Sequence, residues 1–136
     1  MDADQGWQVI VLKFSMKGRP GIKKNSRVNF VRAGKQMSIP SKRYQDFEKE
    51  LRVVIALAMI DCKFQEPISV PVNMKLVIHF RNHQHEPDLS NSYQGIEDCL
   101  EDCGVLVNDK LIYSHNGSDK IFGAKEDWFE VEVTLR

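Results

Sequence analysis

The segment from residue 88 to residue 109 constrains the fold most, because its apolar residues recur with the period of an α-helix. One face of the predicted helix carries Leu89, Tyr93, Ile96 and Leu100. Asp88 stands where a short carboxylate can cap the first free backbone N–H groups, and Gly104 stands where helices commonly end. The segment therefore predicts a helix followed at once by a turn that contains Asn108 and Asp109.

Three aspartates are spread along this helix and turn. Asp88 lies at the start, Asp98 lies about three turns further on, and Asp109 lies in the turn. Where the helix lies beside the turn, we expect the three carboxylates to converge, and a bound cation relieves such a like-charge cluster. Oxygen ligands without paired thiolates favour Mg²⁺, with Mn²⁺ as a substitute. Taken singly, each aspartate also fits a plainer role as a cap, a solvated carboxylate or a turn residue.

Alternating apolar and polar residues predict three longer strands, at residues 7–15, 70–81 and 128–135. Residues 27–31 and 36–39 flank the sequence Arg32-Ala33-Gly34-Lys35, which predicts a hairpin. A second helix is predicted to begin after Ser41, which would cap it, and to run to about Asp61.

The resulting order of strands and helices predicts an α+β fold. Short strands at residues 111–114 and 120–122 would complete a mixed or antiparallel sheet, with the two main helices packed on one face. A chain of 136 residues is expected to form one domain, which here spans residues 1–136.

Composition excludes the disordered and membrane-spanning classes of protein. The chain is 42% hydrophobic and 28% charged, and its longest apolar run, residues 53–60, is too short to cross a bilayer. Residues 1–6 are acidic and polar, unlike a secretory signal. We therefore expect a cytoplasmic protein without a membrane partner or a small-molecule cofactor.

Charge is divided unevenly between the two halves of a chain whose net charge is zero. Residues 1–60 carry 12 Lys/Arg and 5 Asp/Glu, whereas residues 61–136 carry 7 and 14. Such a division allows a basic face for a polyanion beside an acidic pocket for metal, although the two halves could also simply neutralise each other in the fold. The cations of the loop at residues 16–26 and its border are Lys17, Arg19, Lys23, Lys24 and Arg27.

A Mg²⁺ carboxylate site next to basic loops suits phosphodiester hydrolysis. The metal would activate a water molecule, orient the scissile phosphate and neutralise the charge that develops on its oxygens. Lysine and arginine side chains would hold the nucleic-acid backbone in register without reading its sequence. The alternative for the loop cations is that they are only solvated.

The three cysteines offer a different possibility. Cys62, Cys99 and Cys103 are an odd number without a recognised spacing, which indicates reduced thiols in a cytosolic chain. A zinc-stabilised interaction domain would use His83, His85, Cys99 and Cys103, but these residues lack the usual ligand spacings.

Several motifs together resemble those of a known family. The central ones are Asp88-Leu89-Ser90-Asn91, Asp98-Cys99-Leu100, Gly104-Val105 and Asn108-Asp109. Before them come Gly18-Arg19-Pro20, Lys23-Lys24 and Arg27, and after them comes the segment 114–121. Over most of the chain, this pattern resembles the RusA-type Holliday junction resolvases. The resemblance implies a small homodimeric α+β endonuclease that cuts four-way DNA junctions with Mg²⁺, often within a phage or prophage recombination system.

The resemblance also implies roles for individual residues. Asp88 and Asp109 match the first and the distal catalytic aspartates of the family, and Asp98 matches the helix aspartate between them. Three positions depart from the pattern: Ser90 stands where many members have an aspartate, Gln94 where many have a lysine, and Asn108 where many have an acid. Either Asp98 completes the ligand set in this chain, or the protein binds junctions and cuts them weakly.

The leading hypothesis is a Mg²⁺-dependent, structure-selective DNA endonuclease that resolves branched DNA in recombination or repair as a homodimer. Its metal and catalytic residues would be Asp88, Asp98 and Asp109. Its DNA-binding residues would be Arg19, Lys23, Lys24, Arg27, Asn91 and Gln94.

Overall fold

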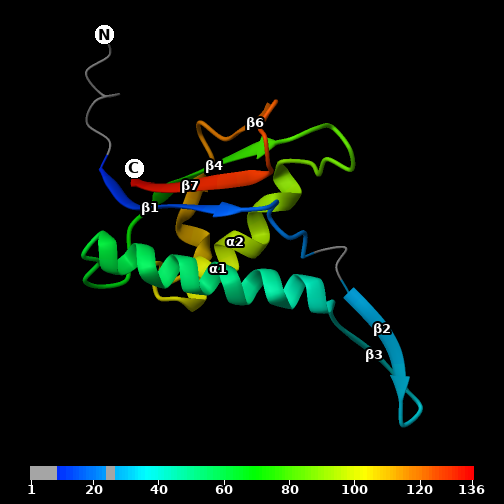
Figure 1. Ribbon diagram of the computed structural model, residues 1–136. Helices are drawn as coiled ribbons and strands as arrows, with labels where there is room; N and C mark the ends of the chain where they lie inside the picture. Colours follow the sequence, from blue (N-terminus) through cyan, green and yellow to red (C-terminus); the bar gives the residue numbers. More distant parts are fainter. Residues whose placement is uncertain (1–8, 24–26) are drawn as a thin grey trace.

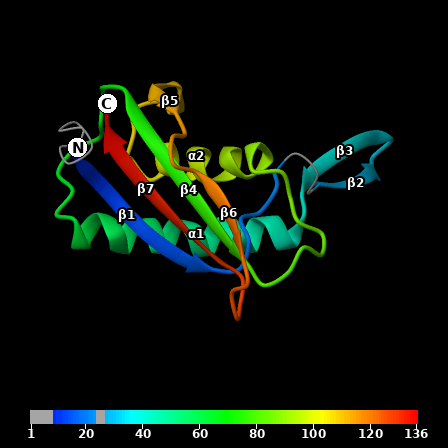
Figure 2. The same ribbon diagram turned by 90° about the horizontal axis from the view of Figure 1, so that it is seen from above.

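The computed structural model describes residues 9–23 and 27–136. Its main sheet joins β1 (Ile10–Lys17), β7 (Trp128–Leu135) and β4 (Val72–Phe80) in that order, with antiparallel pairing. The other edge of β4 pairs in parallel with two short strands, β5 (Ile112–Ser114) and β6 (Asp119–Phe122) (Figure 2). The predicted α+β class and mixed sheet are confirmed. The first strand runs to Lys17, two residues beyond the predicted end.

A loop separates β5 from β6 along the edge of β4. The Asn73 side chain accepts hydrogen bonds from Ser114 Oγ and from the backbone N–H of Asn116, at 2.6 and 2.7 Å. The backbone N–H of Leu76 would otherwise lack a strand partner, and it donates to Ser118 Oγ at 3.0 Å. Side-chain hydrogen bonds therefore replace backbone pairing along β4 where the edge strand is interrupted.

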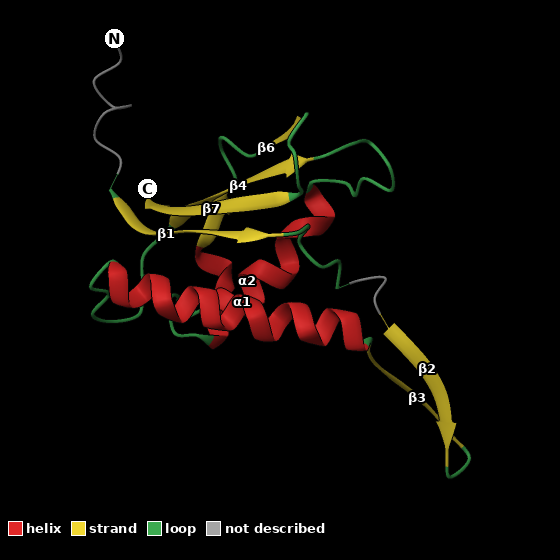
Figure 3. Cartoon of the chain, in the orientation of Figure 1, coloured by secondary structure: helices red, strands yellow, loops and turns green. Residues whose placement is uncertain are grey.

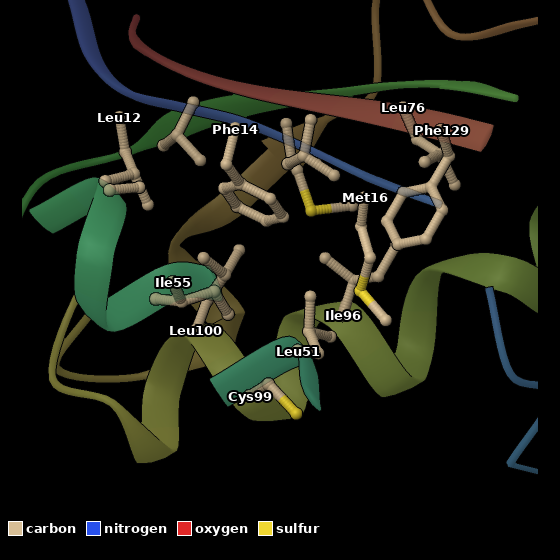
Figure 4. Packing of buried hydrophobic residues seen from close by; sticks show 14 of the residues in the cluster. Leu12, Phe14, Met16, Leu51, Ile55, Leu76, Ile96, Cys99, Leu100 and Phe129 are labelled. Atoms are coloured by element: carbon tan, nitrogen blue, oxygen red, sulfur yellow. The ribbon is translucent and has the colours of Figure 1, made fainter. Parts of the chain in front are cut away.

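Two helices, α1 (Lys42–Asp61) and α2 (Tyr93–Asp102), cover the same face of the sheet (Figures 1 and 3). The core lies between these layers (Figure 4), where side chains of β1, the helices and β7 interlock. Its buried members include Leu12, Phe14, Met16, Leu51, Ile55, Ile96, Leu100 and Phe129. The opposite face of the sheet is polar: His79 stacks on Trp128 and pairs with Glu130. The two faces agree with the alternation of apolar and polar residues along the strands, which predicts one buried face and one solvated face.

The ends of α1 follow the sequence prediction. Ser41 Oγ accepts a hydrogen bond from the backbone N–H of Tyr44 at 3.2 Å, and the helix ends at Asp61. The end of α2 is also confirmed, because Gly104 adopts a φ of 83° and Val105 N–H donates to the Leu100 carbonyl at 2.9 Å. Together with the bond from Gly104 N–H to the Glu101 carbonyl at 3.0 Å, this bond forms a Schellman motif, which glycine favours.

The start of α2 differs from the prediction. The chain enters through a 3₁₀ turn, η2 (Ser90–Ser92), so the residues at the cap positions are Leu89 and Ser92, and neither makes a side-chain cap. Asp88 contributes its backbone carbonyl, which accepts from Asn91 N–H at 3.2 Å. The predicted carboxylate cap at Asp88 is therefore wrong, and the carboxylate stays exposed.

The predicted hairpin forms from β2 (Arg27–Arg32) and β3 (Lys35–Pro40). Ala33 and Gly34 make its two-residue turn, and both have positive φ, as the favoured hairpin turns require. The hairpin is a separate two-stranded sheet and projects from the end of the molecule where α1 begins (Figure 1). Among the described residues, no helix is long and apolar enough to cross a membrane.

Candidate functional site

Successive acidic residues of α2 point to different neighbours. Asp98 forms an ion pair with Lys23 of the basic loop at 2.5 Å, and Asp102 pairs with Arg52 of α1 at 3.1 Å. The hydrogen bond from Lys23 to Asp98 raises the pKa of Lys23. On the side toward β5, Glu97 contacts His115 at 2.6 Å, and Glu101 accepts the backbone N–H of Asp109 at 2.8 Å. Asp98 therefore faces away from Asp109.

Asp88 and Asp109 lie at opposite ends of α2. Asp88 precedes the 3₁₀ turn that leads into the helix, whereas Asp109 begins η3 (Asp109–Leu111), beside the last helical turn. The helix alone rises about 14 Å between its first and last residues. Within one chain, the two carboxylates are thus too far apart to share an ion. Accordingly, the described part of the chain contains no group of three His, Cys, Asp or Glu side chains that could hold a metal.

The carboxylates of Asp88 and Asp109 nevertheless differ from that of Asp98. Neither has a hydrogen bond or an ion pair with any residue in the described ranges, whereas Asp98 is held by Lys23. Unengaged carboxylates at a surface are suitable ligands for a hard divalent cation. Mg²⁺ commonly uses one or two protein carboxylates together with substrate phosphates, so either carboxylate can supply one ligand to this ion.

The four residues of the zinc hypothesis are not brought together. His83 stacks on Phe122 with 3.7 Å between ring centroids, and the carbonyl of His85 accepts from Arg19. Cys99 is buried on the other side of α2, where its thiol contacts Glu48, and burial raises its pKa to about 12. A cysteine binds zinc as a thiolate, and the buried environment of Cys99 disfavours that form.

Arg19, a predicted DNA contact, instead fastens two loops together. Its Nε donates to Asp127 at 3.1 Å, and its terminal nitrogens donate to the carbonyls of Asn82, Gln84 and His85. The guanidinium also lies over the Phe80 ring. Most of its N–H donors are used inside the protein, so Arg19 shapes residues 82–87, the connector that leads to Asp88.

The other predicted DNA contacts occupy varied positions. Lys23 is paired with Asp98, Lys24 lies outside the described residues, and Arg27 donates to both oxygens of Ser38. Asn91 is half-buried and Gln94 is exposed. Of these two residues, Gln94 therefore has the more accessible side chain, and it lies one helical turn before Asp98.

Two glycines allow the basic loop to lie close to the helices. A Cβ at Gly21 would lie 2.7 Å from the Phe47 ring, and one at Gly95 would lie 2.5 Å from the Tyr44 hydroxyl. Tyr44 is almost fully buried, and its hydroxyl finds no hydrogen-bond partner among the described residues. Burial raises the pKa of Tyr44, so this phenol stays protonated. Close packing at these glycines holds the loop over α1 and α2.

A pocket of about 650 Å³ opens between the basic loop, the start of α1 and the connector before Asp88. Its lining includes Arg19, Arg43, Arg81, Asp127 and Pro87. Asp127, the acid in this lining, is occupied by Arg19 and by the backbone N–H of Arg81. The guanidinium groups of Arg43 and Arg81 have no hydrogen-bond or ion-pair partner in residues 9–23 and 27–136. The pocket is therefore cationic, and it adjoins Asp88 through Pro87.

Lys120 fixes the connector from the other side. Its ammonium contacts Glu86 at 3.0 Å and the Pro87 carbonyl at 3.3 Å. The hydrogen bond from Lys120, followed by that from His83, lowers the pKa of Glu86. Asp88 thus follows directly on a backbone that Arg19 and Lys120 hold at two points.

Sequence reasoning missed Arg43, Arg81 and the cluster in which Tyr93 stacks on His115, which also binds Glu97. One signal for Arg43 was present: Lys42 and Arg43 stand in the first turn of a helix, where the dipole disfavours cations. For Arg81 and the His115 cluster, the neighbouring residues come from distant segments, and the local sequence pattern gives no indication of them.

A mixed sheet with two helices on one face and an exposed carboxylate beside a cationic pocket defines a small α+β protein suited to a polyanionic ligand. The family model for endodeoxyribonuclease RusA matches residues 17–136. The chain belongs to this family of endodeoxyribonucleases, which confirms the resemblance in its motifs. No curated protein gives a significant match.

Proposed function

We propose that the protein is a Mg²⁺-dependent endonuclease that cuts branched DNA, such as four-way junctions, in recombination or repair. The observation that carries this proposal is the exposed, unengaged carboxylate of Asp88, which directly follows Pro87 in the lining of an arginine-containing pocket. A nuclease needs this combination, because a site for a cation must adjoin a site for the phosphate backbone.

The pocket supplies the phosphate site. Arg43 and Arg81 line it, and their guanidinium groups can pair with phosphate oxygens in a bidentate manner. Arg19 holds Asp127 and the carbonyls of the connector, and Asp127 accepts the backbone N–H of Arg81, so the pocket wall is set before DNA arrives. Gln94 stands in the first turn of α2, and Lys23 contacts Asp98 about one turn further on, so both extend the polar surface along the helix.

Mg²⁺ bound at Asp88 would neutralise charge on the scissile phosphate and lower the pKa of the attacking water. Asp88 provides a hard oxygen ligand, and the DNA phosphate can provide others. Lys23 engages Asp98 through Oδ2, so Asp98 could join the ligand set through its other oxygen or after release by Lys23. In the described arrangement, Asp98 instead anchors the basic loop through Lys23.

The separation of Asp88 and Asp109 bears on the proposed homodimer. If both carboxylates serve one ion, Asp109 must come from a second copy of the chain, because α2 keeps them apart within one copy. A symmetric dimer also suits a junction that has two equivalent strands to cut.

The direct test is cleavage of a four-way junction in Mg²⁺ by wild type, Asp88→Asn and Asp109→Asn. Asp61→Asn, at the exposed far end of α1, is the matched control. We expect the first two variants to lose about a hundredfold or more in cleavage rate, since a lost metal ligand costs several kcal/mol of transition-state stabilisation. Equal cleavage by wild type and Asp88→Asn would show that the assigned site is wrong.

The second candidate is a RusA-like protein that binds junctions and cuts them weakly. Two observations favour it: Ser90 and Gln94 occupy the positions where the family pattern has an acid and a lysine, and both are exposed. Gel shifts of junction DNA without nicking in Mg²⁺ or Mn²⁺ would support this candidate. The double substitution of Ser90→Asp with Gln94→Lys should then create nicking, and continued inactivity would count against it.

A further inference from the structure

The hairpin of β2 and β3 is exposed on both of its faces. Every residue from Arg27 to Ile39 is exposed. The pairs Val28–Ile39 and Phe30–Met37 place four apolar side chains on one face, and these are 36% to 46% exposed. The pair Arg32–Lys35 stands at the tip of the same face. An apolar strip that ends in two cations thus lies open to solvent.

The hairpin is held in shape by its own bonds. Arg27 ties the two strands at the base through Ser38, and the turn at Ala33 and Gly34 has the twist that suits a hairpin. A two-stranded hairpin is at best marginally stable in water without a covering surface. Exposed apolar side chains in such a projection therefore indicate a binding surface.

Charge indicates what covers it. The sequence has no Asp or Glu between Arg27 and Gln45, whereas it has Arg32 and Lys35 at the tip and Lys42 and Arg43 just beyond β3. Pro40 leads directly into the start of α1, where Arg43 lines the cationic pocket. Cations thus stand at the tip of the hairpin and again between its base and the pocket, and such an arrangement is complementary to a nucleic-acid backbone.

We propose that the β2–β3 hairpin is a DNA-binding arm that selects branched DNA. Arg32 and Lys35 contact phosphates beyond the pocket, and Phe30 with Met37 lies against bases that a branch point leaves unstacked. A two-stranded ribbon can enter a DNA groove, and apolar side chains can occupy an opened base step. The proposal deepens the proposed function and rests on it, because it assigns a substrate-selecting element to that enzyme.

The first experiment compares binding of the full chain to a four-way junction and to a linear duplex of equal length, in EDTA and at several salt concentrations. The charge-reversal pair Arg32→Glu and Lys35→Glu is expected to weaken binding of both DNAs at least tenfold and to lower the salt slope by about two, one per lost phosphate contact. Lys63→Glu, just past the far end of α1, is the matched control and is expected to change little. Unchanged affinity and slope in the double variant would overturn the proposal.

The second experiment tests the apolar face with a control on the same hairpin. Phe30→Ala is expected to weaken junction binding about tenfold, and duplex binding much less, because a continuous duplex offers few open base faces. Val31→Ala alters the opposite face, where the side chain is 69% exposed, and is expected to leave both affinities unchanged. Circular dichroism of each variant checks that the fold persists. Equal losses for junction and duplex would overturn the selection of branched DNA.

Other outcomes separate this proposal from the proposed function. If wild type cuts junctions but the hairpin variants bind and cut as wild type does, the proposed role of the hairpin is wrong and the proposed nuclease activity is supported. If wild type never cuts, yet the hairpin variants lose junction binding selectively, the proposed nuclease activity is wrong and the proposed role of the hairpin is supported. If Phe30→Ala converts a dimer into a monomer in sedimentation and leaves DNA affinity per dimer unchanged, the apolar face covers a second copy and the proposal fails.

Discussion

The Lys23 ammonium lies 2.5 Å from the Asp98 carboxylate, and this ion pair joins the basic loop to the middle of α2. Both side chains are partly exposed, so solvent screens the pair, and we expect it to contribute less than about 1 kcal/mol to the free energy of unfolding. A double-mutant cycle with Lys23→Met and Asp98→Asn in urea unfolding measures this coupling.

The same pair predicts a pH dependence. Because the folded-state pKa of Lys23 is raised above 10.5, its contribution is fully present below that value and is lost as pH rises through the raised pKa. The coupling should therefore be constant around neutral pH and should vanish in strongly alkaline solution.

Mn²⁺ binding tests the role of Asp98 in a different way. If Asp98→Asn weakens Mn²⁺ binding as much as Asp88→Asn does, Asp98 is a metal ligand rather than an anchor for the loop.

Gly95→Ala is expected to destabilise the protein by about 1–3 kcal/mol. The added methyl group would overlap the Tyr44 hydroxyl, and the buried ring has little room to move. Tyr44→Phe removes a hydroxyl without a partner in the described residues, so it should stabilise by roughly 1 kcal/mol and relieve most of the Gly95→Ala defect. Urea unfolding of the two single variants and the double variant checks this, and additive effects would contradict the overlap.

Arg19→Lys and Asp127→Asn should have similar effects if Arg19 is structural. Either change breaks the contact that fixes the connector before Asp88, so both should lower the melting temperature and slow junction cleavage. A direct phosphate contact by Arg19 predicts a different outcome, in which Arg19→Lys lowers the salt slope of binding while Asp127→Asn does not. Thermal unfolding and salt-dependent binding of the two variants distinguish these roles.

Mixing inactive variants tests whether two copies share one site. If Asp88 of one copy acts with Asp109 of another, equal amounts of Asp88→Asn and Asp109→Asn form a mixed dimer with one intact site, and the mixture should nick junctions. If both residues act within one chain, the mixture should stay inactive, as each variant alone does. A fluorescently labelled junction, assayed before and after subunit exchange, gives the readout.

Local chemistry made much of the fold predictable. The hairpin turn at Ala33 and Gly34, the Ser41 cap and the stop at Gly104 depend on neighbouring residues, and all three form as expected. The predicted cap at Asp88 does not form, because the chain enters α2 through a 3₁₀ turn. The spacing of apolar residues does not reveal this turn.

The candidate site was harder to predict, since it depends on contacts between distant segments. Helical periodicity placed Asp98 on a polar face but could not show that Lys23, 75 residues earlier, occupies that carboxylate. It also gave no indication that Asp109 would dock at the far end of α2 from Asp88. Likewise, the partners of Arg19 lie 63 to 108 residues later in the chain, so its role in holding loops could not be read from the basic loop alone.

The interrupted strand beside β4 also affects how copies of the protein meet in concentrated solution. Edge-to-edge aggregation of sheets requires a long, continuous row of free backbone donors and acceptors. Here the edge consists of β5 with three residues and β6 with four, and the loop that carries His115 and Ser118 bulges between them. This side of the sheet therefore gives an incoming strand no continuous register to copy, which protects the molecule from fibril-like growth.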